Sequence, residues 1–531
     1  MTDGPHRLAV IGAGPAGLAA SLAAAAHGVR VTLIDSAPAA GGQFYRRPAS
    51  GLGARRPGAL HHRWRTWQRL ERELAAHLEA GRVEHLTDHH VWTVERTGTT
   101  SGTRPGFTVH ALLGPLQERS VAVRADAVLL ATGGYEKVLP FPGWTLPGVV
   151  TAGGAQAMLK GGLVLPGRRV VVAGSGPLLL PVATGLAAAG AEVAALVESL
   201  DPRALLRGAG SFAAQPGKIA EGASYAAGLL RHRVPFVPRH TVVEAHGETR
   251  VEAVTVAALA PDGRVRPGTG RRVPCDTLAV GHGMVPHTDL AEALGCRVDD
   301  SKVAVDDEQR TDVPGVWAAG ETTGIGGAGL ALAEGRLAGR SVAARLNGRE
   351  PDPRGAARAV RVRARGRSFA AALDAVYAPP AHWAEQVTDD TVVCRCEEVT
   401  AGRVREAVTG LGAGDVRTVK LLTRAGMGWC QGRMCESAVA GLAGCERTPV
   451  RRLLARPVPL GVLAGTGPDD DGTPGEGAAD QASREDTADR TPGPGDDLTS
   501  GTGNDPAPGT GNGLTPGTSD PGPIPGTDTT A

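Results

Sequence analysis

The chain has 531 residues, a formal net charge of +1 at pH 7 and seven cysteines. Its length predicts two to four domains, and its near-neutral charge excludes a strongly basic protein that binds nucleic acid or an acidic membrane surface. No apolar run is long enough to cross a bilayer and no signal-peptide pattern is present. We therefore expect a cytoplasmic location, with membrane association only through a partner.

Residues 7–35 predict a strand–helix–strand unit that binds a dinucleotide. An apolar strand leads into glycines in the order G-x-G-x-x-G, an alanine-rich helix follows, and a second apolar strand ends at an acid. The glycines allow a tight turn, close approach of a pyrophosphate and close helix packing, while the acid can accept from a ribose hydroxyl. The predicted binding residues are Gly12, Ala13, Gly14, Pro15, Ala16, Gly17 and Asp35.

Three later segments are predicted to approach the same ligand. Gly42 and Gln43 follow soon after the ribose-binding acid, although an ordinary turn explains their spacing equally well. A buried strand ends in small residues that let a cofactor approach, and a further strand ends in a glycine and a carboxylate that can bind a ribityl hydroxyl. These last residues are Ala131, Thr132, Gly133, Gly320 and Glu321.

A second unit of the same kind begins at Arg168. It repeats the first two glycines and the terminal acid, but Leu179 replaces the third glycine, which predicts a helix less tightly packed on its strand. Two interpretations stay open, a pyridine-nucleotide site or a retained domain whose ligand is different or lost. The predicted nucleotide-binding residues are Gly174, Ser175, Gly176, Pro177 and Glu198.

Five of the seven cysteines lie between residues 394 and 445. Cys394 and Cys396 form C-x-C, and Cys430 and Cys435 form C-x4-C. Four thiolates suit a [2Fe–2S] cluster or a structural zinc, and the cluster is favoured because zinc knuckles usually use C-x2-C pairs. No residue is assigned as catalytic.

The C-terminal residues 461–531 are rich in Gly, Pro, Thr and Asp and lack aromatic residues, which predicts a disordered tail. Residues 468–531 carry thirteen Asp and Glu against two Arg, a net charge of −11, which leaves +12 for residues 1–467 because the whole chain carries +1.

The motifs GAGPAG with Asp35, ATGG, GSGPLL with Glu198, and AAGE resemble the pyridine nucleotide-disulfide oxidoreductase superfamily. That resemblance implies FAD on the first unit and NAD(P)H on the second. Neither C-x-x-C nor C-x4-C occurs before residue 394, so the redox disulfide of thioredoxin reductase is missing. The strings CRCEEVT and TRAGMGWCQGRMC resemble the bacterioferritin-associated-ferredoxin-like [2Fe–2S] domain, which implies the four cysteines as cluster ligands.

The cysteine quartet together with LPFPGWTLPGVVTAGGAQ resembles the FAD-dependent alpha (A-type) subunit of opine oxidases, proline and hydroxyproline dehydrogenases and hydrogen cyanide synthase. This implies an FAD-dependent oxidoreductase subunit that takes electrons from a glycine/sarcosine-oxidase-like flavoprotein partner and passes them to an acceptor. That partner would dehydrogenate a small amino acid or secondary amine. The alternatives are a self-contained NAD(P)H-dependent FAD oxidoreductase and a non-catalytic nucleotide-binding scaffold or redox-sensing subunit.

The predicted fold class is α/β, with two Rossmann-like dinucleotide-binding domains, a small all-α [2Fe–2S] module and a disordered tail. The second domain is predicted to be inserted into the first. The predicted domains are a discontinuous FAD-binding domain (1–138 and 282–345), the inserted NAD(P)-binding-like domain (139–281), a linker (346–388), the [2Fe–2S] domain (389–458) and the tail (461–531).

Overall fold

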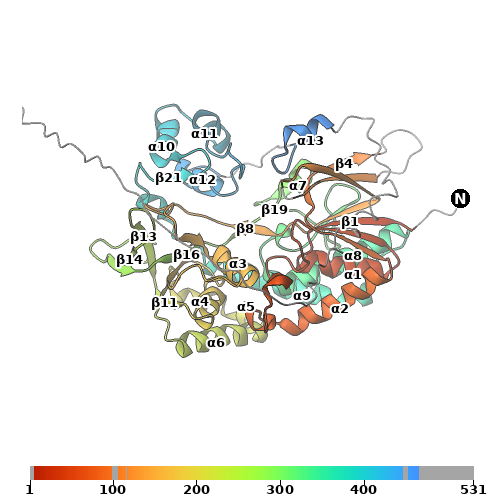
Figure 1. Ribbon diagram of the computed structural model, residues 1–531, viewed down its shortest axis with the longest axis horizontal. Coiled ribbons are helices and arrows are strands. Elements are labelled where there is room, and N and C mark those ends of the chain that lie inside the picture. Colours follow the sequence, from red (N-terminus) through yellow and green to blue (C-terminus); the bar gives the residue numbers. More distant parts are fainter. Residues whose placement is uncertain (1–4, 98–105, 115, 447–452, 466–531) are drawn as a thin grey trace, which may run out of the picture. The chain divides into compact units, whose positions relative to one another are not determined.

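Two five-stranded parallel sheets form the frame of the protein (Figure 1). The structure is a computed structural model that describes residues 5–97, 106–114, 116–446 and 453–465. The first sheet has the strand order β20 (Val316–Ala318), β7 (Ala127–Leu130), β1 (Arg7–Ile11), β2 (Arg30–Ile34) and β3 (Val83–Leu86).

The central strand β1 is buried on both faces. Successive side chains of a strand point in opposite directions, so those of β1 enter two different cores. Leu8 and Val10 pack in one core with the helices α1 (Pro15–Ala26), α2 (Trp64–Glu79) and α8 (Gly327–Leu346). Ala9 and Ile11 pack in a second core on the other face. That face is covered mainly by an antiparallel sheet, formed by β4 (His90–Thr97), β5 (Gly106–Leu113) and β6 (Arg119–Ala125).

The second parallel sheet repeats this plan. Its strand order is β12 (Phe236–Pro238), β11 (Glu192–Glu198), β10 (Arg169–Gly174), β16 (Thr277–Gly281) and β9 (Val149–Thr151). Helices α3 (Ala152–Gly162), α4 (Leu179–Ala188) and α6 (Pro216–Arg231) share one core with it. The other face packs against the antiparallel strands β13 (His240–His246), β14 (Ala253–Ala258) and β15 (Arg271–Pro274). The chain enters this unit through β8 (Gly134–Glu136) and leaves it through β17 (Met284–Pro286), which pair with each other.

After the first unit closes, the long helix α9 (Pro353–Val376) leads to a small helical module. Its helices α10 (Ala401–Thr409), α11 (Val416–Thr423) and α12 (Glu436–Ala443) lie together in Figure 1 and share one apolar core. The module also contains a two-stranded ladder of β21 (Val392–Cys394) and β22 (Val399–Thr400), which the all-α prediction did not include. Further short elements are α5 (Ala209–Ala213), α7 (Asp289–Ala293), β18 (Val298–Asp299) and β19 (Lys302–Val303).

The predicted start of the tail, residue 461, is wrong. Helix α13 spans Leu460–Gly465, and its Val462 is buried against Trp92 and Leu112 of the β4–β5 pair. A few apolar residues suffice there because the sheet supplies the rest of the core. The predicted tail beyond residue 465 lies outside the described residues.

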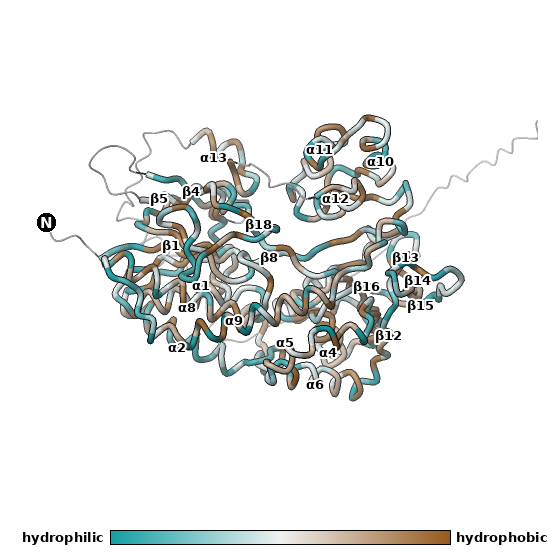
Figure 2. The backbone as a smooth tube through the Cα atoms, turned by 180° about the vertical axis from the view of Figure 1, so that it is seen from behind, coloured by the Kyte–Doolittle hydropathy of each residue, from teal (hydrophilic) through white to brown (hydrophobic). Residues whose placement is uncertain are grey.

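Hydrophilic and hydrophobic residues are mixed along the helices of the described backbone (Figure 2). Of the helices in the described part of the chain, none combines the length and apolar character needed to span a membrane.

Helices α1 and α8 pack so closely that glycine is required between them. A Cβ added to Gly335 would lie 2.1 Å from the carbonyl oxygen of Ala16, and one added to Gly339 would lie 2.3 Å from that of Ala20. Backbone atoms cannot move aside as a flexible side chain can. This contact fixes the C-terminal part of the first unit against its first helix.

Replacing Gly339 with Ala should force the two helices apart and lower the free energy of unfolding by about 1–3 kcal/mol, the usual effect of overpacking a tight core. The matched control is Gly222→Ala in α6, where an added Cβ meets no atom within 4 Å. Thermal unfolding followed by circular dichroism measures both. Equal midpoints for the two variants would contradict the inferred contact.

Candidate functional site

Two positions of the first glycine loop can be occupied only by glycine. Gly12 has a φ of +104°, and a Cβ there would lie 2.4 Å from the carbonyl oxygen of Ala131. A Cβ on Gly17 would lie 1.8 Å from the carbonyl oxygen of Gly12. The structure therefore brings the end of β7 against the loop that joins β1 to α1, as the sequence predicted for a dinucleotide site.

The opposite side of this loop is open. Gly12, Gly14 and Pro15 are half-exposed, whereas Ala13 and Ala16 are buried. The nearest atom to a Cβ on Gly14 would be the Cα of Gly42, at 3.9 Å.

In the turn of residues 41–46, one residue lies against the glycine loop and another faces solvent. Gly42 faces Gly14, since a Cβ on Gly42 would lie 2.7 Å from the Gly14 Cα. Gln43 is exposed, and its side-chain oxygen accepts from Arg46 Nε at 3.1 Å. Two backbones without side chains thus face each other where a pyrophosphate would need to approach.

Asp35 ends β2 beside this loop and is buried. Its carboxylate accepts from the backbone N–H groups of Ala13, at 2.5 Å, and Ala37, at 2.8 Å. Burial raises the pKa of Asp35, and these N–H groups act in the opposite direction. The acid is therefore held in a fixed orientation at the position that the sequence assigned to a ribose-binding residue.

The joint after β20 contains a buried acid that the sequence motifs did not indicate. Glu334 of α8 is fully buried, accepts from the N–H of Gly320 at 2.9 Å and forms an ion pair with Arg367 of α9 at 2.6 Å. Burial raises the pKa of Glu334, with Arg367 opposing that effect. Burial also raises the pKa of the predicted ligand Glu321, whose carboxylate accepts from the N–H of Gly327 at the start of α8. A lone acid in the apolar run GLALAEG was the available signal for Glu334.

The ATGG joint is linked to the return of the chain from the second unit. The Thr132 hydroxyl donates to the carbonyl oxygen of His287 at 2.7 Å, and the N–H of His287 donates to the carbonyl oxygen of Gly133 at 2.9 Å. Gly133 has a φ of +73°. Ala131, Thr132 and Gly133 therefore lie beside the first glycine loop, on the side from which β17 arrives.

The second glycine loop joins strand to helix in the same way, but its glycines are buried. Gly174 has a φ of +132°, and a Cβ there would lie 1.7 Å from the carbonyl oxygen of Gly281. Gly174, Ser175 and Gly176 are all buried, and only Pro177 is exposed. The Ser175 hydroxyl donates to the carbonyl oxygen of Tyr377 at 2.7 Å, just after the end of α9.

The acid of the second unit is also buried. Glu198 accepts from the N–H of Leu200 at 3.2 Å and from that of Gly176 at 3.4 Å. Burial raises the pKa of Glu198 to about 8. Helix α4 begins at Leu179, three positions after the second glycine, whereas α1 begins directly after Gly14.

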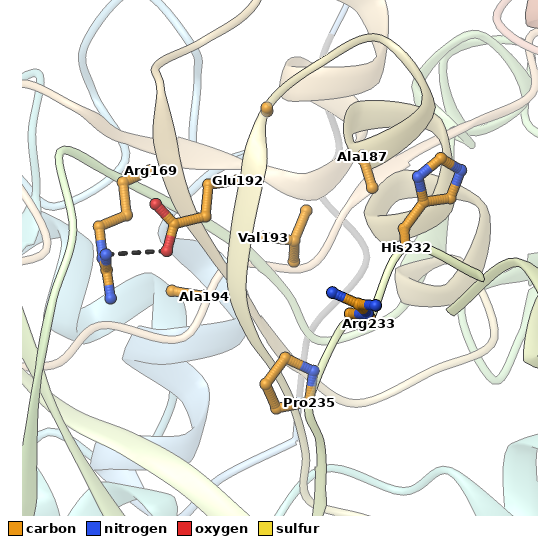
Figure 3. A pocket seen from close by; sticks show the side chains of 9 residues that line it. Arg169, Ala187, Glu192, Val193, Ala194, His232, Arg233 and Pro235 are labelled. Carbon is orange, nitrogen blue, oxygen red and sulfur yellow. Dashed lines mark ion pairs between the residues drawn. The ribbon is translucent and has the colours of Figure 1, made fainter. Parts of the chain in front are cut away.

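A surface hollow of about 470 Å³ lies elsewhere in the second unit (Figure 3). Arg169 and Glu192, which form an ion pair at 2.8 Å, line it at the starts of β10 and β11. Ligands of open parallel sheets bind at the carboxyl ends of the strands. This hollow is at the amino ends and therefore is not the nucleotide site.

The four predicted cysteines come together in the helical module as two pairs. The Cys435 thiol donates to Cys394 and lowers the pKa of Cys394 to about 5, and the same contact raises the pKa of Cys435. Cys396 is hydrogen-bonded to Cys430, and all four interact electrostatically. Within the described ranges, no three His, Cys, Asp or Glu side chains are arranged to hold a single metal ion.

Glycines allow the two cysteine segments to meet. A Cβ on Gly428 would lie 2.2 Å from the Cβ of Cys396, and the N–H of Gly426 donates to the Cys394 sulfur at 3.5 Å. Cys394 and Cys435 are buried, whereas Cys396 is exposed. The cysteine site therefore has one buried and one accessible side.

These features define a class of protein, an oxidoreductase built on two dinucleotide-binding folds with an added four-cysteine module. Residues 6–343 match the family described as pyridine nucleotide-disulphide oxidoreductase, and residues 392–443 match the BFD-like [2Fe-2S] binding domain. The chain belongs to the pyridine nucleotide-disulphide oxidoreductase family, and it is an FAD-dependent oxidoreductase. The first match implies binding of a flavin or nucleotide, and the second implies a [2Fe–2S] cluster.

Two named relatives and one solved structure match most of the length of this chain. The A-type subunit of opine oxidase from Agrobacterium tumefaciens (strain Ach5) is 33% identical over 463 residues, which cover 84% of this chain and 87% of that protein. Hydrogen cyanide synthase subunit HcnB of Pseudomonas aeruginosa is 34% identical over 438 residues, covering 81% and 90%. The crystal structure of L-proline dehydrogenase from P. horikoshii shares the fold, with a TM-score of 0.56, 20% identity and coverage of 87% and 80%. The predicted fold class and family resemblance are confirmed.

Replacing Glu198 with Gln should remove a pH dependence of stability. Because the folded pKa lies near 8 and the ordinary value is 4.5, the unfolded chain ionises this group at a pH where the folded protein keeps it protonated. The stability linked to Glu198 is therefore complete below pH 4.5 and decreases as the pH rises to about 8. The thermal midpoints of wild type and Glu198→Gln should agree near the lower pH and diverge upward, with the variant more stable.

The control for this comparison is Glu192→Gln, which changes an exposed carboxylate of the same strand. It should follow the wild-type pH profile. A wild-type-like pH profile for Glu198→Gln as well would show that Glu198 ionises normally in the folded protein.

Proposed function

We propose that this chain is the FAD- and [2Fe–2S]-containing electron-transfer subunit of a multi-subunit dehydrogenase of amines or amino acids. The substrate class is an opine, proline, hydroxyproline or glycine-type amine. A separate flavoprotein subunit of the glycine/sarcosine-oxidase type dehydrogenates the substrate, and this chain passes the electrons to an acceptor. The relatives named as A-type subunits of opine oxidase, and the partial match to the alpha subunit of sarcosine oxidase from Corynebacterium sp. (strain U-96), support a subunit role.

The observation that carries this proposal is the contrast between the two glycine loops. The first loop is half-exposed, and the N–H of its Ala13 donates to the buried Asp35. By contrast, Gly174–Gly176 of the second loop are buried and Ser175 is hydrogen-bonded to the carbonyl oxygen of Tyr377. A covered second loop is a poor entry point for NAD(P)H, which argues against the self-contained NAD(P)H oxidoreductase. Electrons then need another donor and another carrier, and the cysteine quartet suits the carrier.

The residues of the first site fit FAD. Gly12, Gly14 and Gly42 are part-exposed and carry no side chain, so a pyrophosphate can approach their backbone, and Asp35 is placed for a ribose hydroxyl. Ala13, Pro15, Ala16, Gln43, Ala131, Thr132, Gly133, Gly320 and Glu321 remain assigned to the same site. Gly174, Ser175, Gly176, Pro177 and Glu198 remain the assignment for any nucleotide of the second unit.

The cysteine site fits a two-iron cluster. Cys394 with Cys435, and Cys396 with Cys430, form two pairs, and a [2Fe–2S] cluster needs two protein ligands on each iron. The Nε of Arg433, in the loop between Cys430 and Cys435, is buried and has no hydrogen-bond partner among the described residues. When bound, a flavin exchanges two electrons with a hydride donor and single electrons with such a cluster.

Substituting a cysteine of either pair should remove the cluster and leave the flavin. Cys396→Ser and Cys435→Ser are expected to lose most of the iron and the visible and electron paramagnetic resonance signals of the cluster. The FAD content should stay at the wild-type level, because the flavin site lies in another unit. Cys445→Ser is the control, since this half-buried cysteine belongs to neither pair. Full iron content in Cys435→Ser would contradict the ligand assignment.

The division of labour is tested by measuring amine-dependent dye reduction. The purified chain alone should reduce no dye with proline, hydroxyproline, sarcosine, glycine or an opine. Dye reduction should begin when the glycine- or sarcosine-oxidase-like product of a neighbouring gene is added, and Cys396→Ser should reduce it strongly. Substrate-dependent reduction by this chain alone would refute the proposed role.

A further inference from the structure

Arg433 joins the loop between Cys430 and Cys435 to the first unit. The guanidinium of Arg433 forms an ion pair with Asp289, the first residue of α7, and also donates to the carbonyl oxygen of Ala455. The side chains are largely buried, with exposed fractions of 21% for Arg433 and 15% for Asp289. Arg433 thus links the cysteine loop, the first unit and the segment that follows the module.

Asp289 continues this link to the flavin joint. Its carboxylate lies 3.2 Å from Nε2 of His287. The carbonyl oxygen of His287 accepts from the hydroxyl of Thr132 at 2.7 Å and from that of Thr322 at 2.8 Å. Thr132 follows the residue that touches Gly12, and Thr322 follows Glu321. The carbonyl oxygen of His287 therefore contacts both predicted FAD-binding joints. The side chain of the same residue begins the series, through Asp289 and Arg433, that leads to the cysteine loop.

We infer that Arg433, Asp289 and His287, here called the cluster clamp, position the cysteine loop on the flavin-binding joint so that electrons can pass between them. These are positioning residues, since none of them is a proposed ligand of either group. The inference rests on the proposed function and adds the residues that set the approach of the two sites.

The charge state of the clamp supports a strong attachment. Burial acts to raise the pKa of Asp289, but the hydrogen bond and charge of His287 and the charge of Arg433 outweigh it and lower the pKa to about 2. Asp289 is therefore ionised at neutral pH. Removing one partner of a largely buried ion pair leaves the other charge uncompensated, which is costly.

A second attachment of the module provides a matched control. The indole N–H of Trp144 donates to the carbonyl oxygen of Val392 at 2.6 Å, and the guanidinium of Arg395 lies 5.3 Å from the centre of a Trp144 ring. Trp144 follows β8 on the way into the second unit, and no hydrogen bond or ion pair among the described residues joins it to the clamp. Trp144→Phe removes the hydrogen bond and keeps an aromatic ring, so it weakens the module attachment away from the flavin joint.

The clamp is tested with Asp289→Asn, which keeps the shape of the side chain and removes its charge. Hydrogen–deuterium exchange of residues 424–435 should become about tenfold faster, the effect expected when a coupling of ~1.4 kcal/mol is lost. Trp144→Phe should instead speed exchange around residues 391–395. The swapped pair Asp289→Arg with Arg433→Asp should restore part of the protection.

The second readout is electron sharing in the holoprotein. With both groups bound, an electron leaving a photoreduced flavin would reduce one ferric ion of the cluster. The loss of the reduced-flavin absorbance and the rise of the cluster's electron paramagnetic resonance signal would therefore both measure this transfer. Asp289→Asn should slow this step by more than about twofold, because the cysteine loop loses the contact that fixes its distance from the flavin joint. Trp144→Phe should leave the rate within about twofold, and both variants should keep wild-type FAD and iron contents.

The outcomes separate the clamp from the proposed function. Unchanged exchange of residues 424–435 in Asp289→Asn, or equal effects of Asp289→Asn and Trp144→Phe on electron sharing, would overturn the clamp. Absence of a cluster signal in the wild type would overturn the proposed function, while the exchange measurement, which needs no cluster, would still decide on the clamp.

Discussion

Backbone contact at three glycines, Gly17, Gly335 and Gly339, holds the first unit together. Each lies against a carbonyl oxygen at a distance that leaves no room for a Cβ. The first of these contacts shapes the loop before α1, and the other two press α8 onto α1. Because the whole second unit intervenes in sequence between the two helices, this packing is what returns the AAGE joint to the GAGPAG loop. The open site, Asp35 and the buried Glu334 all depend on that closure.

The same frame is used twice with opposite accessibility. Both units have a parallel sheet covered by helices on one face and by antiparallel strands on the other, and both place a glycine against the carbonyl of a neighbouring strand. In the second unit the helix begins later and α9 ends over the glycine loop. The second unit has thus kept the architecture of the first, while Tyr377 after α9 lies against its glycine loop. In this part of the chain, a retained fold does not by itself imply a retained ligand site.

The parts that the sequence predicted are those defined by local backbone geometry. Gly12, Gly174 and their strands follow from short-range patterns, and spacing indicates the four cysteines, although the structure pairs each cysteine of one segment with a cysteine of the other. The missed features join distant residues. Ser175 and Tyr377 are 202 positions apart, and Asp289 and Arg433 are 144 apart, so no local pattern indicates either contact. The tail boundary was misplaced for the same reason, since Val462 is buried only because the β4–β5 pair supplies its neighbours.

The cysteine module is attached to the rest of the protein at both ends. Helix α9 leads into it from the first unit, and the segment after it returns to that unit, where the N–H of Ala455 donates to the carbonyl oxygen of Trp92 at 2.8 Å and α13 packs on the sheet. Because the module is held at both ends, its effective concentration at its contact surface on the first unit is high, whatever the strength of any single contact. Release of the cysteine loop would therefore be local and brief, and recapture would be intramolecular. Electron exchange within this chain would then be independent of protein concentration, whereas exchange with a partner protein would depend on it.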